Sequence, residues 1–309
     1  MRTDQFPIVI IGCPRSGTTL LRRLFDAHPQ ISCPGESFVL RAAVRFLRGE
    51  QVADGINYGP LGGLSALGFD HDEIRARVRA LALSFHHQLA QKDGKLRCAI
   101  KTAVDAFYLP EIHALFGDEV KYVCLLRHGA DVAISMREFT DTMEGVIEEL
   151  MPFVLRHRRI LPACAAAWAE VTSEMLDLAE CHSDHVVALR YEDLVASPRE
   201  VLEEIFAFLD APCDIQAVMA EAFRPAEVRG LGDYKTYATG RVQTSSVGRW
   251  TSMPERHKAE LAPIINPVLE RAGYDAIKVA APVRDDGLRR HELAMMLQSA
   301  RRAGGGGDG

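Results

Sequence analysis

The segment IVIIGCPRSGTT, residues 8–19, joins a short apolar run to a glycine-containing turn and decides the fold. Gly12 and Gly17 have the G-x-x-x-x-G spacing of a phosphate-binding loop. Backbone N–H groups of such a turn, followed by a helix N-terminus, bind phosphate through hydrogen bonds and the helix dipole. A purely structural glycine turn is the alternative, but the apolar run before the turn and the amphipathic residues 19–27 after it favour an anion site.

The loop has Thr18 where a nucleoside triphosphatase has a lysine that reaches the β- and γ-phosphates. Arg15 is then the available cation, and its planar fork of donors suits phosphate or sulfate oxygens. Gly17 contributes its backbone, and hydroxyl groups from Ser16, Thr18 and Thr19 add donors. These residues predict a ligand with one phosphate carrying a short anionic group and no metal ion, which argues against a metal-dependent nucleotide kinase.

Length and composition favour one large domain. The chain has 309 residues, of which 48% are hydrophobic, and these are enough to bury a sizeable core. We expect a single domain over residues 1–280, followed over 281–309 by a C-terminal helix and a disordered glycine-rich tail. A formal net charge of −6 argues against general nucleic-acid binding.

Cysteine usage and hydropathy indicate the compartment. The seven cysteines form no C-x-x-C pair and are odd in number, as expected of reduced, mostly buried thiols. No apolar run approaches the roughly 20 residues of a membrane span, and the first strand, which begins by Phe6, leaves no room for a signal peptide. We therefore expect a cytoplasmic protein without a membrane span.

Short apolar runs alternate with helical stretches along the chain. Buried strands are predicted at Phe6–Ile11, Arg97–Lys101, Lys121–Leu126 and Val186–Leu189. The alternation predicts an α/β fold, a P-loop-type open parallel sheet flanked by helices on both faces, with ligands at the carboxyl ends of the strands. Helices are predicted at 38–48, 72–91, 131–137, 155–179, 198–209 and 254–272, and a surface loop at 51–69.

Three motifs give the chain a family resemblance. The strings PRSGTTLL (14–21), DAHP (26–29) and PGES (34–37) resemble sulfotransferases that use 3'-phosphoadenosine-5'-phosphosulfate (PAPS), and further motifs recur to about Tyr274. Within that superfamily the chain is most similar to the tyrosylprotein sulfotransferases and their bacterial relatives. The resemblance implies an enzyme whose first loop holds the 5'-phosphosulfate and which releases 3',5'-adenosine bisphosphate. A homodimer is one expected assembly.

A second anion site is predicted after the strand that ends at Leu126. Arg127 lies on the following loop and Ser135 eight residues later, roughly 11 to 12 Å away if the interval is helical. A loop folding back at Gly129 shortens that distance, and the resemblance assigns both residues to the 3'-phosphate. A surface ion pair and an unrelated helix serine are the alternative.

The resemblance also extends the donor site to two later segments. Tyr191 follows a predicted strand where relatives have a tyrosine near the adenine, although a tyrosine half buried against the sheet is nearly as plausible. The segment SSVGRW, residues 245–250, corresponds to a flap that carries a basic residue over the donor. Arg249 is that residue here, with Ser245 and Ser246 as weaker candidates and a solvated loop as the alternative.

Sulfuryl transfer is an in-line displacement that needs a base and a cation. Lys101 ends a predicted strand at the edge that carries the first loop, so it is our candidate for stabilising the leaving oxygen. The steroid- and phenol-type relatives have a K-T-H pattern, whereas this chain reads Lys101, Thr102, Ala103. Glu36 aligns with the catalytic glutamate of the tyrosylprotein enzymes and is the best candidate for the base, with His28 as the fallback.

Two sequence features bear on the acceptor substrate. Arg41, Arg45 and Arg48 have helical spacing and form either a basic face for an acidic acceptor or a solvated stripe. The tyrosylprotein enzymes have an arginine two residues beyond the glutamate, where this chain has Phe38. We expect transfer to a hydroxyl group of a small molecule, sugar, lipid or peptide tyrosine. A P-loop kinase or a non-catalytic nucleotide-binding module remains as the alternative.

Overall fold

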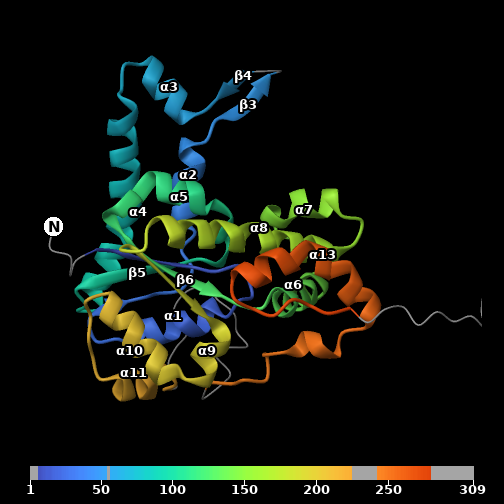
Figure 1. Ribbon diagram of the computed structural model, residues 1–309. Helices are drawn as coiled ribbons and strands as arrows, with labels where there is room; N and C mark the ends of the chain where they lie inside the picture. Colours follow the sequence, from blue (N-terminus) through green and yellow to red (C-terminus); the bar gives the residue numbers. More distant parts are fainter. Residues whose placement is uncertain (1–5, 54–55, 225–241, 280–309) are drawn as a thin grey trace, which may run out of the picture. The chain divides into compact units, whose positions relative to one another are not determined.

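The computed structural model describes residues 6–53, 56–224 and 242–279 (Figure 1). Within these residues a five-stranded sheet has the strand order β2-β5-β1-β6-β7, and each neighbouring pair is parallel. Its strands are β1 (Ile8–Ile11), β2 (Ile31–Ser32), β5 (Arg97–Lys101), β6 (Lys121–Leu126) and β7 (Val186–Arg190). The predicted parallel sheet is confirmed, and β1, which precedes the glycine turn, lies at its centre.

Alternate residues of β1 face two separate hydrophobic clusters. Ile8 and Ile10 pack into the cluster formed with helices α1 (Thr18–Asp26), α9 (Tyr191–Ala196), α10 (Pro198–Phe208) and α11 (Ile215–Ala222). Val9 and Ile11 pack into the cluster formed with α5 (Leu109–Phe116), α6 (Gly129–Met143), α8 (Ile160–Cys181) and α13 (Glu255–Arg271). Helices therefore cover both faces, as the uninterrupted apolar strands predicted (Figure 1).

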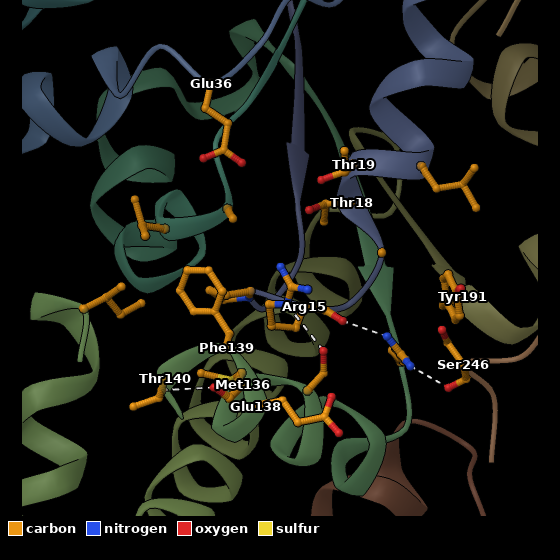
Figure 2. Close-up of a pocket in the computed structure, with 18 of the residues that line it drawn as sticks. Arg15, Thr18, Thr19, Glu36, Met136, Glu138, Phe139, Thr140, Tyr191 and Ser246 are labelled. Carbon is orange, nitrogen blue, oxygen red and sulfur yellow. Dashed lines mark hydrogen bonds between the residues drawn. The ribbon is translucent and has the colours of Figure 1, made fainter. Parts of the chain in front are cut away.

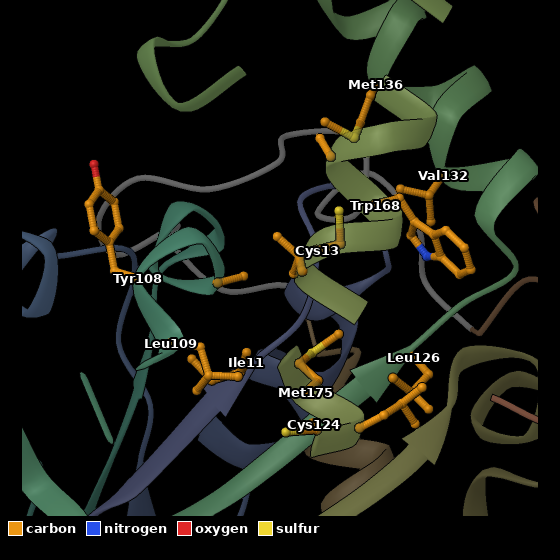
Figure 3. Packing of buried hydrophobic residues seen from close by; sticks show 14 of the residues in the cluster. Ile11, Cys13, Tyr108, Leu109, Cys124, Leu126, Val132, Met136, Trp168 and Met175 are labelled. Carbon is orange, nitrogen blue, oxygen red and sulfur yellow. The ribbon is translucent and has the colours of Figure 1, made fainter. Parts of the chain in front are cut away.

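Trp168 on α8 is the largest fully buried side chain of the described residues. It packs with Val132 and Met136 of α6 in the second cluster, close to Cys13 at the start of the loop after β1 (Figure 3). Its indole N–H donates to the carbonyl of Arg127, 3.0 Å away. The core thus fixes the backbone from which Arg127 projects.

The region predicted as one helix at 155–179 contains two. Helix α7 spans Met151–Arg156, and α8 begins only at Ile160. Pro162 explains the break, because its ring clashes with the carbonyl four residues earlier in any helix that continues through it, whereas it is tolerated in the first turn. The other helices include α2 (Val39–Leu47) and α4 (His71–Lys92), and 3-10 segments span Ala103–Tyr108 (η2), Glu148–Leu150 (η4) and Arg249–Ser252 (η5).

The prediction of a surface loop at 51–69 is wrong. Strands β3 (Glu50–Ala53) and β4 (Ile56–Tyr58) pair in an antiparallel hairpin, and α3 spans Pro60–Ala66. Pro60 stands in the first helical turn, where its fixed φ angle favours a helix and its missing N–H costs no hydrogen bond. None of the residues of α3 is buried, which explains why hydrophobic periodicity did not reveal it.

The predicted C-terminal helix and tail, residues 281–309, lie outside the described residues. All seven cysteines are free thiols, and five of them are buried. Among the described helices, none combines enough length with enough apolar character to cross a lipid bilayer.

Candidate active site

A cavity of about 790 Å³ lies at the carboxyl ends of the strands, within the size range of small-molecule sites (Figure 2). Its polar part, which we name the donor end, is lined by Arg15, Gly17, Thr18, Thr19, Arg127, Ser135, Tyr191 and Ser246. Its lining also includes Glu36, Lys101 and Arg249. Of the residues predicted from the sequence, Ser16 and Ser245 do not line this cavity: Ser16 is a buried residue of the loop and Ser245 is exposed.

The loop after β1 has a backbone that few residues tolerate. The amide of Ser16 donates to the carbonyl of Cys13 at 3.0 Å, which closes the turn. Gly17 has φ 97°, and a Cβ there would lie 2.4 Å from the ring of Tyr191, so only glycine fits. Arg15 also has a positive φ, 74°. The hydroxyl of Ser16 is buried and has no hydrogen-bond partner among the described residues.

Arg127 is a buried cation that forms no ion pair with a described carboxylate. It is 5% exposed, and its guanidinium lies 4.6 Å from the centre of the Tyr191 ring. Two of its nitrogens donate to the carbonyls of Arg15 at 2.8 Å and Ser246 at 2.6 Å, while its Nε has no partner among the described residues. Burial lowers the pKa of Arg127, and the nearby charges of Asp131 and Glu192 offset only part of that effect.

Ser135 lies beside the same loop. Helix α6 begins at Gly129, so the chain turns back after Arg127 and places Ser135 less than two helical turns from the start of the helix. The Nε of Arg15 lies 3.4 Å from the hydroxyl of Ser135. The structure therefore brings Arg15, Arg127 and Ser135 together at the donor end, as the fold-back at Gly129 predicted.

Asp131, which the sequence analysis did not predict, anchors the segment Gly248–Trp250 at the donor end. The buried carboxylate of Asp131 accepts from the backbone N–H groups of Gly248, at 2.7 Å, and Trp250, at 2.8 Å. The ring of Trp250 stacks on His128 with centroids 4.6 Å apart. Arg249, between these anchors, forms an ion pair with Glu138. No local pattern joins positions 131 and 248, so only the folded chain reveals this contact.

Glu36 and Lys101 form an ion pair at the cavity wall. The Nζ of Lys101 donates to the Oε1 of Glu36 at 2.5 Å, and the two side chains are 2% and 14% exposed. Lys101 is the last residue of β5, and Glu36 follows β2, the neighbour of β5 in the sheet. The hydroxyl of the adjacent Ser37 lies 3.0 Å from Nε2 of the buried His86 on α4, which holds the Glu36 loop in place.

His28, the fallback base, has a structural role instead. Its Nε2 lies 2.9 Å from the carbonyl of Ala211, and its Nδ1 accepts from the amide of Gln30 at 3.0 Å. Its side chain is fully buried, and burial lowers its pKa. Since both ring nitrogens are engaged and His28 is not part of the cavity lining, this histidine is excluded as the base.

A second carboxyl group, Asp105, lies behind the ion pair and was not predicted. It stands in η2, four residues after Lys101, and is 1% exposed. Burial, and secondarily the charge of Glu36, raises the pKa of Asp105 to about 8. This carboxyl therefore carries its proton at neutral pH.

The structure contradicts one of the two interpretations of the arginine stripe, the free basic face. The stripe consists of Arg41, Arg45 and Arg48. Arg41 pairs with Glu148 at 2.7 Å and with the buried Glu149 at 2.8 Å. Arg45 pairs with Glu148, and Arg48 pairs with Glu111. The acidic residues of η4 and α5, distant in the sequence, thus compensate the charge of this stripe.

Comparison with known proteins identifies the family. A model described as the sulfotransferase family matches residues 7–214. A putative protein-tyrosine sulfotransferase of Caenorhabditis briggsae is 26% identical over 271 residues, which cover 87% of this chain and 89% of that protein. The nodulation protein NoeE of Sinorhizobium fredii is 27% identical over 268 residues, covering 81% of this chain and 62% of that protein.

Solved structures agree in fold. The sulfotransferase domain of the Synechococcus PCC 7002 olefin synthase superposes with a TM-score of 0.61 at 21% identity, covering 88% of this chain and 96% of that chain. Mouse sulfotransferase SULT7A1, complexed with PAP, superposes with a TM-score of 0.51 at 14% identity, covering 96% of this chain and 90% of that chain. The chain belongs to the sulfotransferase family, the PAPS-dependent enzymes that its motifs resemble, and it is itself a sulfotransferase.

Proposed function

We propose that the donor end holds PAPS with its 3'-phosphate at Arg127 and Ser135 and its 5'-phosphosulfate on the loop after β1. One observation carries the proposal: the buried guanidinium of Arg127, which forms no ion pair with a carboxylate among the described residues, shares a cavity with the phosphate-binding loop. A buried cation without an ion-pair partner is costly, and a bound anion offsets that cost. The Nε of Arg127, which has no hydrogen-bond partner among the described residues, can donate to such an anion.

Transfer proceeds by in-line displacement at sulfur. Glu36 removes the proton from the acceptor hydroxyl, and the acceptor oxygen forms its bond to sulfur as the bond from sulfur to the bridging oxygen breaks. Lys101 donates a hydrogen bond to that bridging oxygen, which leaves with the negative charge on the 5'-phosphate. The products are the sulfated acceptor and 3',5'-adenosine bisphosphate.

No metal ion takes part in the proposed step, because Lys101 and Arg15 supply the positive charge. Turnover should therefore be unchanged in the presence of EDTA. The location that we propose is the cytoplasm, and the seven free thiols support it.

Calorimetry tests the donor. We expect 3',5'-adenosine bisphosphate to bind with at least tenfold higher affinity than ATP with magnesium, because the loop lacks the lysine of a triphosphatase. Tight binding of ATP without binding of the bisphosphate would overturn the proposal.

Lys101→Ala tests the chemical step. This variant should lower kcat by about 10²- to 10³-fold, the loss typical of one transition-state donor, while the affinity for the bisphosphate changes less than threefold. Equal losses in turnover and affinity would remove Lys101 from the leaving-group role.

A further inference from the structure

The cavity continues beyond Glu36 and Lys101 into a second, apolar part. We name this part the apolar end and define it by the apolar lining residues Phe38, Val104, Phe139, Met143, Ile147 and Leu150. Glu138, Thr140 and Thr142, from the same stretch of α6, also line the cavity. These side chains come from the residue before α2, from η2, from the second half of α6, and from Ile147 and Leu150, which precede and end η4. Figure 2 shows Phe139 on the side of Arg15 that faces away from Tyr191 and Ser246. The apolar end thus lies opposite the donor end.

Glu36 stands at the boundary between the two ends. Its carboxylate is paired with Lys101, so the pair adds no net charge to the wall that an acceptor approaches. Arg15 lies over the ring of Phe139, 5.3 Å from its centre, on the side that faces the donor end. An acceptor hydroxyl placed at Glu36 therefore has its remaining atoms among aromatic and aliphatic side chains.

Two arginines of α2, the helix that follows Phe38, are already compensated. Arg41 and Arg45 on α2 pair with Glu148, and Arg41 also pairs with Glu149. The six residues that define the apolar end carry no charge, and Arg15 lies over the ring of Phe139 on the side of the donor end. An anionic group placed among these six side chains, away from Arg15, would lose its hydration without gaining a cation, which is unfavourable.

The charged groups next to Ile147 compensate one another. Glu148 is exposed and pairs with both Arg41 and Arg45, and Glu149 pairs with Arg41. The acidic flanks of a peptide acceptor would therefore find no unpaired cation among these four residues.

We propose that the acceptor is an uncharged molecule with an apolar body and a single reacting hydroxyl, such as a phenol or a medium-chain alcohol. The inference rests on the proposed function, since it assigns the acceptor of the same site. The body packs against Phe139, Ile147 and Met143, and its hydroxyl reaches Glu36. Burial of such a body is favourable by about 25 cal/mol per Å² of apolar surface removed from water.

The test measures release of 3',5'-adenosine bisphosphate from PAPS with four acceptors: 2-naphthol, 1-octanol, glucose, and a tyrosine peptide flanked by glutamates. We expect kcat/KM for 2-naphthol or 1-octanol to exceed that for glucose and the peptide by at least 100-fold. Comparison of 2-naphthol with 1-octanol shows whether the enzyme prefers an aromatic or an aliphatic acceptor.

Met143→Glu places a carboxylate at the apolar end on a side chain that is 62% exposed, so the variant should fold. It should lower kcat/KM for the better apolar acceptor at least tenfold and leave the affinity for the bisphosphate unchanged within twofold. Leu155→Glu is the matched control: Leu155 is 81% exposed and lies outside the cavity lining, so its kinetics should equal those of the unaltered enzyme.

Higher turnover of the acidic peptide or of glucose would overturn this inference. So would binding of the bisphosphate without sulfation of either apolar acceptor, or unchanged kinetics in Met143→Glu. Failure of the proposed function gives a different result, because the bisphosphate itself would not bind.

Discussion

At the residue scale, the site depends on the Glu36–Lys101 pair and on Arg127. The sequence was sufficient to place Lys101 at the end of one apolar strand and Arg127 directly after another. It placed Glu36 only after a proline–glycine turn. It did not predict that Glu36 and Lys101 touch. That contact depends on the pairing of β2 with β5, and β2 has only two residues, too few for a recognisable strand pattern.

Glu36→Gln should remove the proposed general base and keep the shape of the side chain. Because an amide accepts no proton at neutral pH, kcat should fall by about 10²- to 10⁴-fold. Affinity for 3',5'-adenosine bisphosphate, measured by calorimetry, should change less than threefold. Retention of more than a tenth of the turnover would show that another group accepts the proton.

Arg127→Lys should lose the planar fork of donors but keep the positive charge. Hydrogen bonds to charged groups contribute about 1.5–3 kcal/mol, so the affinity for 3',5'-adenosine bisphosphate should fall by roughly tenfold or more. Affinity for 5'-AMP, which lacks the 3'-phosphate, should change less than threefold and serves as the internal control. Parallel losses for both nucleotides would place Arg127 away from the 3'-phosphate.

At the element scale, the carboxyl ends of β1, β5, β6 and β7 all contribute to one cavity. This arrangement was predictable from the alternation of strands and helices, since parallel strands end at the same sheet edge. The segment around Ser246 was predicted only by resemblance. Asp131 of α6 accepts a hydrogen bond from Gly248 and so anchors this segment, although the two residues are 117 positions apart in the sequence.

Asp131→Asn should weaken the anchoring of Gly248 and Trp250 to α6. The two oxygens of Asp131 each accept from a backbone N–H group, whereas an amide offers one oxygen and one NH₂ group. The KM for PAPS should rise by about tenfold, and hydrogen exchange at the amides of Gly248 and Trp250 should become faster. Asp141→Asn, on the exposed part of the same helix, is the control and should alter neither quantity. Unchanged exchange in Asp131→Asn would contradict the anchoring role.

At the scale of the whole molecule, the sequence predicted the layers and the location of the site but not the compensation of charge. The arginine stripe of α2 looked like a possible acceptor surface because its partners, Glu111, Glu148 and Glu149, are 63 to 108 residues away along the chain. Local periodicity carries no information about such pairs. Asp105 was missed for a related reason: a single acidic residue after a strand shows its burial only once the fold is complete.

Asp105 should make the stability of the whole fold depend on pH. Its pKa is about 8 in the folded protein and about 3.9 in an unfolded chain. Between those values the folded state binds more protons than the unfolded state, so the free energy of unfolding decreases as pH rises, by up to about 1.4 kcal/mol per pH unit. This stabilisation is complete below about pH 4 and lost above about pH 8.

Asp105→Asn removes that titration. Its free energy of unfolding, from urea denaturation, should exceed that of the unaltered protein increasingly from pH 5 to pH 8. Asp141→Asn, which changes an exposed carboxylate, provides the control and should follow the unaltered protein. Parallel curves for Asp105→Asn and the unaltered protein would show that Asp105 is ionised in the fold.

Arg15 and Phe38 have φ angles of 74° and 58°, in a region that side chains with a Cβ rarely occupy, and both face the cavity. A left-handed conformation costs roughly 1–2 kcal/mol per residue that is not glycine. Laboratory evolution that selects only for thermal stability of this protein should therefore enrich glycine at these two positions. The selected variants should have a higher melting temperature and a lower rate of sulfation, so stability and activity would change in opposite directions at residues 15 and 38.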